Sequence, residues 1–386
     1  MSSTTWSFGR HRTGVFQGWD RFDFVLTFAA LALVVFGLVL IYSGASSTYS
    51  GPIASMADPA ARQAIFAAFG IGLMLAVSKL DYHYLTHYAW VLYVIGVLSL
   101  VFILGVGHTS FGSTRWFDLG PIQVQPSEFA KLATILALAR YFGDNGADAR
   151  DLRTLIKSLV IVAIPAGLVF IEPDLGTSVV FLAIWVGVVI VAGARRTHLL
   201  VLAGLFIAVL PFAWTFLISD YQVERISVLI DPYNDQNGQG AGYNNIQSEI
   251  AVGSGELFGK GLMNGDQTKF GYLPVATKDF IFSVLGEETG FMGAMILFAL
   301  FILLLMRGIR AAKIAGDTAG QLVASGIVML ILVQAFINIA VNLSLFPVTG
   351  IPLPFVSAGG SSLLTLFIAL GLLQSVAMRH RAYRQY

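Results

Sequence analysis

The chain of 386 residues contains no cysteine and little charge. Without thiols, disulfides, thiolate catalysis, zinc–thiolate sites and iron–sulfur clusters are excluded. Charged residues make up 12% of the chain, about half the share of a typical soluble domain. Hydrophobic residues make up 56%, so a soluble fold would lack the polar surface to cover itself. This composition predicts an integral membrane protein, and the formal net charge of +1 argues against a nucleic-acid partner.

Several local motifs are also missing. We find no P-loop, no GxGxxG after a strand, no HExxH and no GxSxG. The histidines are scattered without the spacing of metal ligands. The chemistry must therefore be sought in other residues.

Long apolar runs, in contrast, are abundant. A run of about 20 apolar residues is long enough to cross a bilayer. Ten such runs are predicted as spans, near residues 22–43, 62–79, 84–106, 125–142, 153–172, 176–194, 197–218, 280–306, 320–346 and 354–378. The first is longer than a signal-peptide core and is predicted to be retained. The sequence predicts an all-α polytopic membrane protein with one transmembrane domain over residues 1–386.

The basic residues orient these spans. With both termini in the cytoplasm, 16 of the 23 Lys and Arg residues lie inside, six lie outside, and Lys131 lies in the membrane. The positive-inside rule thus predicts a multi-pass protein of the bacterial cytoplasmic (inner) membrane with both termini cytoplasmic. One large extracellular or periplasmic loop, residues 219–278, joins spans seven and eight and is too long for a plain tether. Within it, Ile246–Leu262 is apolar enough to lie in the membrane interface.

Two opposite charges occur inside the fourth span. Glu128 and Lys131 are three residues apart and share one helical face. Charges at this depth are costly unless they are paired or line a wet cavity. One interpretation is an ion pair that locks two helices. The other is the lining of a functional cavity, which Arg115 and Trp116, just outside the same helix, favour.

Asp279 stands where the long loop enters the eighth span. It is either the N-cap of that helix or a catalytic carboxylate. Glu287 and Glu288 follow two turns deeper and require a partner, for which Lys131 or Arg115 is a candidate.

Three further features lie near predicted span ends. Residues 346–362 carry prolines and glycines that break helices at membrane depth, which is tolerated where the backbone is buried in protein or lines a cavity. Gln334, Asn338 and Asn342 form a polar stripe, for which we expect interhelical hydrogen bonds. Asp174, in the short turn after the fifth span, is expected to be an N-cap.

Taken together, three segments resemble the signature of the shape, elongation, division and sporulation (SEDS) family. They are Arg115–Lys131, Asp279–Glu288 and Pro352–Ser362, and the resemblance runs from about Asp20 to the last span. Two other segments resemble the elongation members of the family more than its division members. They are Ile246–Gly261 and the Val348-Thr-Gly-Ile-Pro variant of the last motif.

The resemblance implies a peptidoglycan glycosyltransferase, an inverting hexosyltransferase that polymerises lipid II at the outer face of the membrane during cell elongation. It implies a class B penicillin-binding protein (transpeptidase) as partner, with lipid II and membrane lipids as ligands and no nucleic acid. The family's essential carboxylate maps onto Asp279. The family usually has Pro-Glu-x-His-Thr before it, whereas this chain has Pro274-Val-Ala-Thr-Lys278.

In this chemistry a carboxylate accepts the proton of the attacking hydroxyl, and cations stabilise the leaving pyrophosphate. Asp279 is predicted to be the catalytic base, and a divalent cation, Mg or Mn, is a possible cofactor. The predicted substrate-binding residues are Arg115, Trp116, Gln125, Glu128, Lys131, Lys278 and Ser357. The main alternative is a lipid-linked precursor flippase or transporter, because broken helices and intramembrane charges also suit transporters. A non-enzymatic scaffold for the partner is a further alternative.

Overall fold

The computed structural model describes residues 21–45, 57–106, 108–110, 113–118, 123–144, 148–216, 220–231 and 241–379. Its helices are α1 (Phe24–Ala45), α2 (Pro59–Lys79), α3 (Tyr82–His87), α4 (Ala89–Val106), α5 (Pro126–Asp144), α6 (Leu152–Ile171), α7 (Leu175–Val191), α8 (Arg196–Phe216), α9 (Asp220–Ile230), α10 (Ala241–Ser254), α11 (Asp266–Lys269), α12 (Ile281–Ile314), α13 (Thr318–Asn342) and α14 (Gly360–Arg379).

Within the described part of the chain, α1, α2, α4–α8 and α12–α14 coincide with the ten predicted apolar runs. Six of them, α1, α2, α6, α12, α13 and α14, are long and apolar enough to cross a membrane by length and composition, and α4, α7 and part of α8 are shorter apolar helices. The prediction of an all-α polytopic membrane protein is therefore confirmed. The assignment of residues 1–386 to a single domain stays a prediction, since residues 1–20 and 380–386 lie outside the described ranges.

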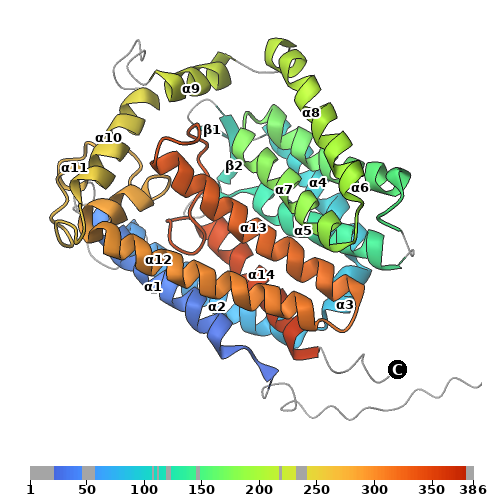
Figure 1. Ribbon diagram of the computed structural model, residues 1–386. Helices are drawn as coiled ribbons and strands as arrows, with labels where there is room; N and C mark the ends of the chain where they lie inside the picture. Colours follow the sequence, from blue (N-terminus) through green and yellow to red (C-terminus); the bar gives the residue numbers. More distant parts are fainter. Residues whose placement is uncertain are drawn as a thin grey trace, which may run out of the picture.

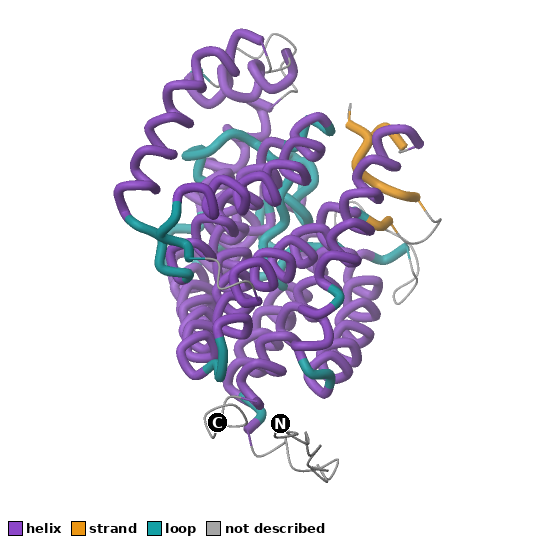
Figure 2. The backbone as a smooth tube through the Cα atoms, turned by 90° about the vertical axis from the view of Figure 1, so that its right-hand side faces the viewer, coloured by secondary structure: helices purple, strands orange, loops and turns teal. Residues whose placement is uncertain are grey.

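The core of the bundle is built around α13 and α14. These two helices are the most buried of the six long apolar helices and lie in the middle of the molecule (Figure 1). Helix α14 packs on α2, whereas α13 packs on α5, α7 and α12. The helices run mostly along one direction, and the strands lie at one end of the bundle, which we call the strand end (Figure 2).

Three short strands cover part of the strand end. β1 (His108–Ser110), β2 (Ser113–Asp118) and β3 (Gln123–Val124) pair antiparallel in the order β1-β2-β3. Phe117 of β2 lies opposite Val124 of β3, directly before α5. The strands thus hold the predicted motif residues Arg115 and Trp116 against the entrance of α5.

The long segment between α8 and α12 contains α9, α10 and α11; its residues 217–219 and 232–240 lie outside the described ranges. Helix α10 packs against α12, where the Ser248 and Ser283 hydroxyls are 2.5 Å apart. Leu257 and Phe258 after α10 are exposed. The interfacial placement of 246–262 stays a prediction.

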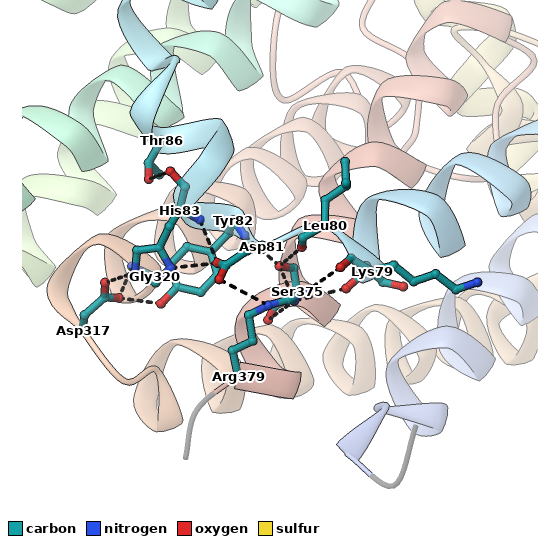
Figure 3. Close-up of polar contacts among 11 residues, drawn as sticks. Lys79, Leu80, Asp81, Tyr82, His83, Thr86, Asp317, Gly320, Ser375 and Arg379 are labelled. Atoms are coloured by element: carbon teal, nitrogen blue, oxygen red, sulfur yellow. Dashed lines mark hydrogen bonds and ion pairs between the residues drawn. The ribbon is translucent and has the colours of Figure 1, made fainter. Parts of the chain in front are cut away.

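At the opposite end, an ionic cluster ties α3 to the α12–α13 turn and to the end of α14 (Figure 3). His83 lies between two carboxylates: its Nδ1 is 2.8 Å from Asp81 Oδ1 and its Nε2 is 2.7 Å from Asp317 Oδ2. Arg379 lies 3.7 Å from Asp81 Oδ2, and its Nη1 donates to the Ser375 hydroxyl. Hydrogen bonds to Asp317 and Asp81 raise the pKa of His83 to about 9, so the imidazole is charged at neutral pH.

This cluster predicts a pH dependence of stability. Because the folded-state pKa of His83 lies above its ordinary value, its contribution is complete below about pH 6.5 and is lost as the pH rises through about 9. We expect the melting temperature of the parent to exceed that of His83→Gln at neutral pH, with the gap closing in alkaline buffer. A gap that stays constant from about pH 6 to about pH 10 would show that the charge of His83 does not stabilise the fold.

Candidate active site

Hydrogen bonds to the backbone of Asp279 fix its position and leave its carboxylate without a bond to any described residue. Its carbonyl accepts hydrogen bonds from the side-chain amides of Asn338 and Asn342, at 3.0 and 2.9 Å. The N-cap of α12 is Phe280, without a side-chain cap bond. Within the described residues no hydrogen bond to the Asp279 carboxylate is present, so the N-cap interpretation is wrong. Of the predicted polar stripe, Asn342 makes an interhelical contact, because its Oδ1 accepts from the Ser283 N–H of α12. Asn338 donates instead to the Asp279 and Ile351 carbonyls, which lie outside the helices.

A non-helical segment before α14 packs against the Asp279 loop. The Ser357 hydroxyl donates to the Lys278 carbonyl and accepts from the Leu353 N–H. Gln63 of α2 donates to the Ser357 carbonyl and accepts from the Gly359 N–H. Ser357, a predicted substrate-binding residue, is buried, and its hydroxyl makes hydrogen bonds to these two backbone groups. A contact with substrate stays a prediction for it.

A cavity of about 370 Å³ opens at the strand end, beside Asp279. Four predicted site residues, Trp116, Gln125, Lys278 and Asp279, line it together. Its other lining residues are Pro59, Arg62, Gln63, Phe66, Gln123, Gly350, Pro352, Ala358, Gly359, Gly360, Ser361 and Ser362. Asp279 is the only acid among these described lining residues. The cavity therefore combines one carboxylate with cationic and amide side chains.

Arg115 is anchored to the turn between α6 and α7. Its Nε donates to the Glu172 carbonyl at 3.1 Å and its Nη2 donates to the Pro173 carbonyl. Its Nη1 is 3.7 Å from Asp174 Oδ2. Asp174 also caps α7 through the Thr177 N–H, which confirms its predicted N-cap role. Burial and the Asp174 charge raise the pKa of Glu172 to about 8, so Glu172 is mostly protonated at neutral pH.

The charge environment of Asp279 combines burial with several cations. Burial raises the pKa of Asp279, while Lys278, Arg225 and Arg115 act to lower it. A Cβ placed on Gly350 would lie 3.8 Å from Asp279 Oδ2 and 4.0 Å from Arg115 Nη1, so Gly350 lies close to both the acid and this arginine. A carboxylate with a raised pKa is a better proton acceptor than an exposed one.

Glu128 and Lys131 are not part of the lining of this cavity. The Lys131 Nζ donates to Glu128 Oε1 at 2.9 Å, and the two residues are 1% and 2% exposed. Both belong to α5, so the pair is intrahelical, and the interpretation as a lock between two helices is wrong. Substrate binding by this pair stays a prediction.

The partners predicted for the deeper acids were also wrong. Glu287 pairs with Lys260 at 2.9 Å, and Glu288 accepts from the Ser43 hydroxyl at 2.5 Å. Neither Lys131 nor Arg115 contacts them in the described structure.

Sequence reasoning missed Arg62, Gln63 and Gln123 of the lining, and Arg225, whose Nη1 donates to the Val348 carbonyl at 2.6 Å. The one available signal was a basic residue at the start of a span, Arg62 after the Asp58-Pro59 cap. The amides carry no such signal.

A preformed metal site is not evident. The described residues contain no group of three or more His, Asp or Glu side chains that could hold a metal ion. Mg²⁺ often binds through one or two carboxylates together with substrate phosphates. Asp279 fits such a minimal donor set, and a divalent cation here stays a proposal.

The fold and the site define a polytopic membrane protein with an acid-bearing polar cavity at one end of its helical bundle. Residues 24–382 match the family model of the FtsW/RodA/SpoVE cell cycle proteins. The chain belongs to this family, which confirms the resemblance drawn from the three motifs.

The relatives agree with this membership. The chain is 39% identical to peptidoglycan glycosyltransferase MrdB of Escherichia coli K12, over 80% of this chain and 83% of the relative. It is 38% identical to stage V sporulation protein E of Bacillus subtilis, over 93% of this chain and 98% of the relative. It is also 35% identical to a probable peptidoglycan glycosyltransferase FtsW of Geobacter metallireducens, over 93% of this chain and 96% of the relative.

Solved structures show the same architecture. A chain from a study of polymerization and crosslinking by a peptidoglycan synthase complex superposes with a TM-score of 0.77 at 31% identity, covering 95% of this chain and 99% of that chain. The rod shape determining protein RodA of Thermus thermophilus superposes with a TM-score of 0.68 at 30% identity, with the same coverage.

Proposed function

We propose that this protein is a peptidoglycan glycosyltransferase that polymerises lipid II into glycan strands at the outer face of the cytoplasmic membrane during cell elongation. The names of the relatives MrdB and FtsW support the activity. The observation that carries the proposal is the junction between the polar cavity around Asp279 and an apolar groove. Such a junction suits a substrate with a sugar–phosphate head and a polyprenyl tail.

The apolar groove has a volume of about 420 Å³ and lies between α4, α5 and α14. Phe117 and Val124 form its end next to the cavity, and the adjacent residues Trp116 and Gln123 line the cavity itself. Because successive side chains of a strand point to opposite faces, β2 and β3 present one face to the cavity and the other to the groove. The β2–β3 pair would then separate the head of the substrate from its tail.

Polymerisation requires the 4-hydroxyl of an acceptor sugar to attack the anomeric carbon of a donor. The new glycosidic bond forms as the bond from that carbon to the lipid pyrophosphate breaks, and attack from the opposite face inverts the configuration. Asp279 accepts the hydroxyl proton. The pyrophosphate leaves with the bonding electrons, and Lys278 and Arg62, which line the cavity, are the cations positioned to stabilise its charge. Arg115, predicted for the same role, is outside the lining and is anchored to the turn between α6 and α7.

A lipid-linked precursor flippase is the second candidate. In transporters of known design the substrate site lies near the middle of the membrane, where broken helices meet. Here the acid and the cations gather at the strand end of the bundle, with the cavity lined from β2, β3 and the α14 entrance. This placement favours chemistry at the membrane surface over transport across it.

Filling the groove tests the proposal. Ser99 of α4 lines the groove, whereas Val94 lies on another, exposed face of the same helix. We expect Ser99→Phe to weaken binding of lipid II by about 1–3 kcal/mol, raising KM about fivefold to about a hundredfold. Val94→Phe, the matched control, should polymerise like the parent. Equal KM values for the two variants would argue against a tail in this groove.

The partner and topology belong to the same proposal. A solved relative comes from a peptidoglycan synthase complex, which supports a class B penicillin-binding protein as partner. The excess of basic residues on one side supports cytoplasmic termini, with the strand end and residues 219–278 outside.

A topology reporter fused after Tyr386 should therefore read as cytoplasmic, and one inserted near Gly240 as external. Both positions lie outside the described residues. The reverse pattern would place Asp279 on the cytoplasmic side and remove the basis for an outer-face reaction.

A further inference from the structure

Helix α12 is broken in the middle of its apolar sequence. Gly290 has φ 65° and ψ −162°, which separates a short N-terminal part of α12, residues 281–289, from the longer part, 291–314. In a continuous helix the N–H groups of Phe291 and Met292 would donate to the carbonyls of Glu287 and Glu288. A break at membrane depth leaves such groups in need of other partners.

All four of these groups bond to one segment of the long loop, residues 255–263, which we call the strap. The strap donates its Lys260 N–H to the Glu287 carbonyl at 2.9 Å and its Gly261 N–H to the Glu288 carbonyl at 3.0 Å. In return the Phe291 N–H donates to the Glu256 carbonyl at 2.9 Å, and the Met292 N–H donates to the Leu257 carbonyl at 3.0 Å. The strap thus replaces two helical hydrogen bonds with four.

This backbone contact requires glycine at particular positions. Gly259 has φ 76°, and a Cβ there would overlap the Glu288 carbonyl. A Cβ on Gly290 would overlap the backbone of Gly259. Glycine is therefore needed both in the strap, at Gly259, and at the break, at Gly290, for the two backbones to approach this closely.

A buried ion pair adds side-chain contacts to the backbone bonds. Glu287 is 0% exposed, and its Oε1 accepts from Lys260 Nζ at 2.9 Å and from the Gln267 N–H at 3.0 Å. Lys260 Nζ also donates to Asp266 Oδ2 at 2.9 Å. At the end of the strap, the Met263 N–H donates to the Ser43 hydroxyl of α1. The strap is thereby tied to α12, to α11 and to α1.

The short N-terminal part of α12, residues 281–289, connects the strap to Asp279. Its nine residues span about 13 Å and begin two positions after the acid. Within it, the Ser283 N–H and hydroxyl both donate to Asn342 Oδ1, while Asn342 Nδ2 donates to the Asp279 carbonyl. A shift of the strap would therefore move a short rigid helix whose other end carries Asp279.

We propose that the strap is the positioning element for Asp279, and that Lys260 and Glu287 are positioning residues that act through the short N-terminal part of α12. This inference rests on the proposed glycosyltransferase function. Positioning acts on the reaction step more than on substrate binding, since a misplacement of about 1 Å can cost about a hundredfold in rate.

The test compares Lys260→Met with Lys269→Met, an exposed lysine on α11. With purified full-length protein and lipid II, we expect Lys260→Met to lower kcat about ten- to a hundredfold with KM within a few-fold of the parent. Lys269→Met should have the kcat and the KM of the parent.

Several outcomes would overturn the inference. A folded Lys260→Met protein with the kcat of the parent would do so, and so would a loss confined to KM. If Lys260→Met does not fold, Glu287→Gln, which removes the charge of the other member of the pair and keeps the size of its side chain, carries the same comparison of kcat and KM. An inactive parent would instead contradict the proposed function, which separates the two failures.

Discussion

Asp279→Asn is expected to yield a stable protein whose glycan synthesis is lower than that of the parent by about two orders of magnitude or more. The amide has nearly the size and shape of the carboxylate but cannot accept the hydroxyl proton. The cavity keeps its volume and its other lining residues. Only the proton acceptor is removed.

Stability should change little, for a structural reason. The Asp279 carboxylate makes no hydrogen bond to any described residue, and α12 uses Phe280 as its N-cap. The backbone carbonyl that fixes the position of Asp279 still accepts from Asn338 and Asn342. The folded structure therefore does not depend on the charge that catalysis requires.

The matched control is Glu249→Gln, which makes the same carboxylate-to-amide change at an exposed position of α10. Lipid II consumption and melting temperature are measured for parent, Asp279→Asn and the control at equal protein amounts. Activity of Asp279→Asn within a few-fold of the parent would refute the catalytic assignment.

Lys131→Met is expected to destabilise the fold by about 3–5 kcal/mol, because it leaves the Glu128 carboxylate buried without its cation. Lys131 is among the most deeply buried large side chains of the described structure. The effect should appear as a lower melting temperature and a lower yield of folded protein. Glu128→Gln combined with Lys131→Met removes both charges and should recover much of this stability.

The same variants decide whether the pair also binds substrate. A purely structural pair predicts a double variant that polymerises lipid II at close to the parent rate per folded molecule. A stable double variant without activity would instead support the substrate role predicted for Glu128 and Lys131. A single variant as stable as the parent would show that the pair contributes nothing to the fold.

The spans could be predicted from sequence because hydrophobic length is a local property. The three motifs likewise placed Trp116, Gln125, Lys278 and Asp279 at span entrances, and the structure brings these four residues to one cavity. Each of them lies next to a feature that is visible in the chain, such as the Pro126 helix start or the end of the long loop.

The break in α12 could not be predicted from its apolar run. Its stability depends on hydrogen bonds between residues 256–261 and 287–292, which are about thirty positions apart. Glu287 pairs with Lys260, and not with the predicted Lys131 or Arg115, because the same contact between the strap and α12 brings Lys260 to it. Periodicity and hydropathy carry no information on such pairings, and a glycine in a span has many explanations.

The most direct test of the central claim is polymerisation of lipid II by the purified protein. The parent, with and without a class B penicillin-binding protein whose own transpeptidase site is blocked, is incubated with lipid II, and the products are separated by size. We expect a ladder of glycan oligomers from the parent and none from Asp279→Asn. Movement of labelled lipid II across a vesicle membrane without any oligomer would contradict the account and indicate a flippase.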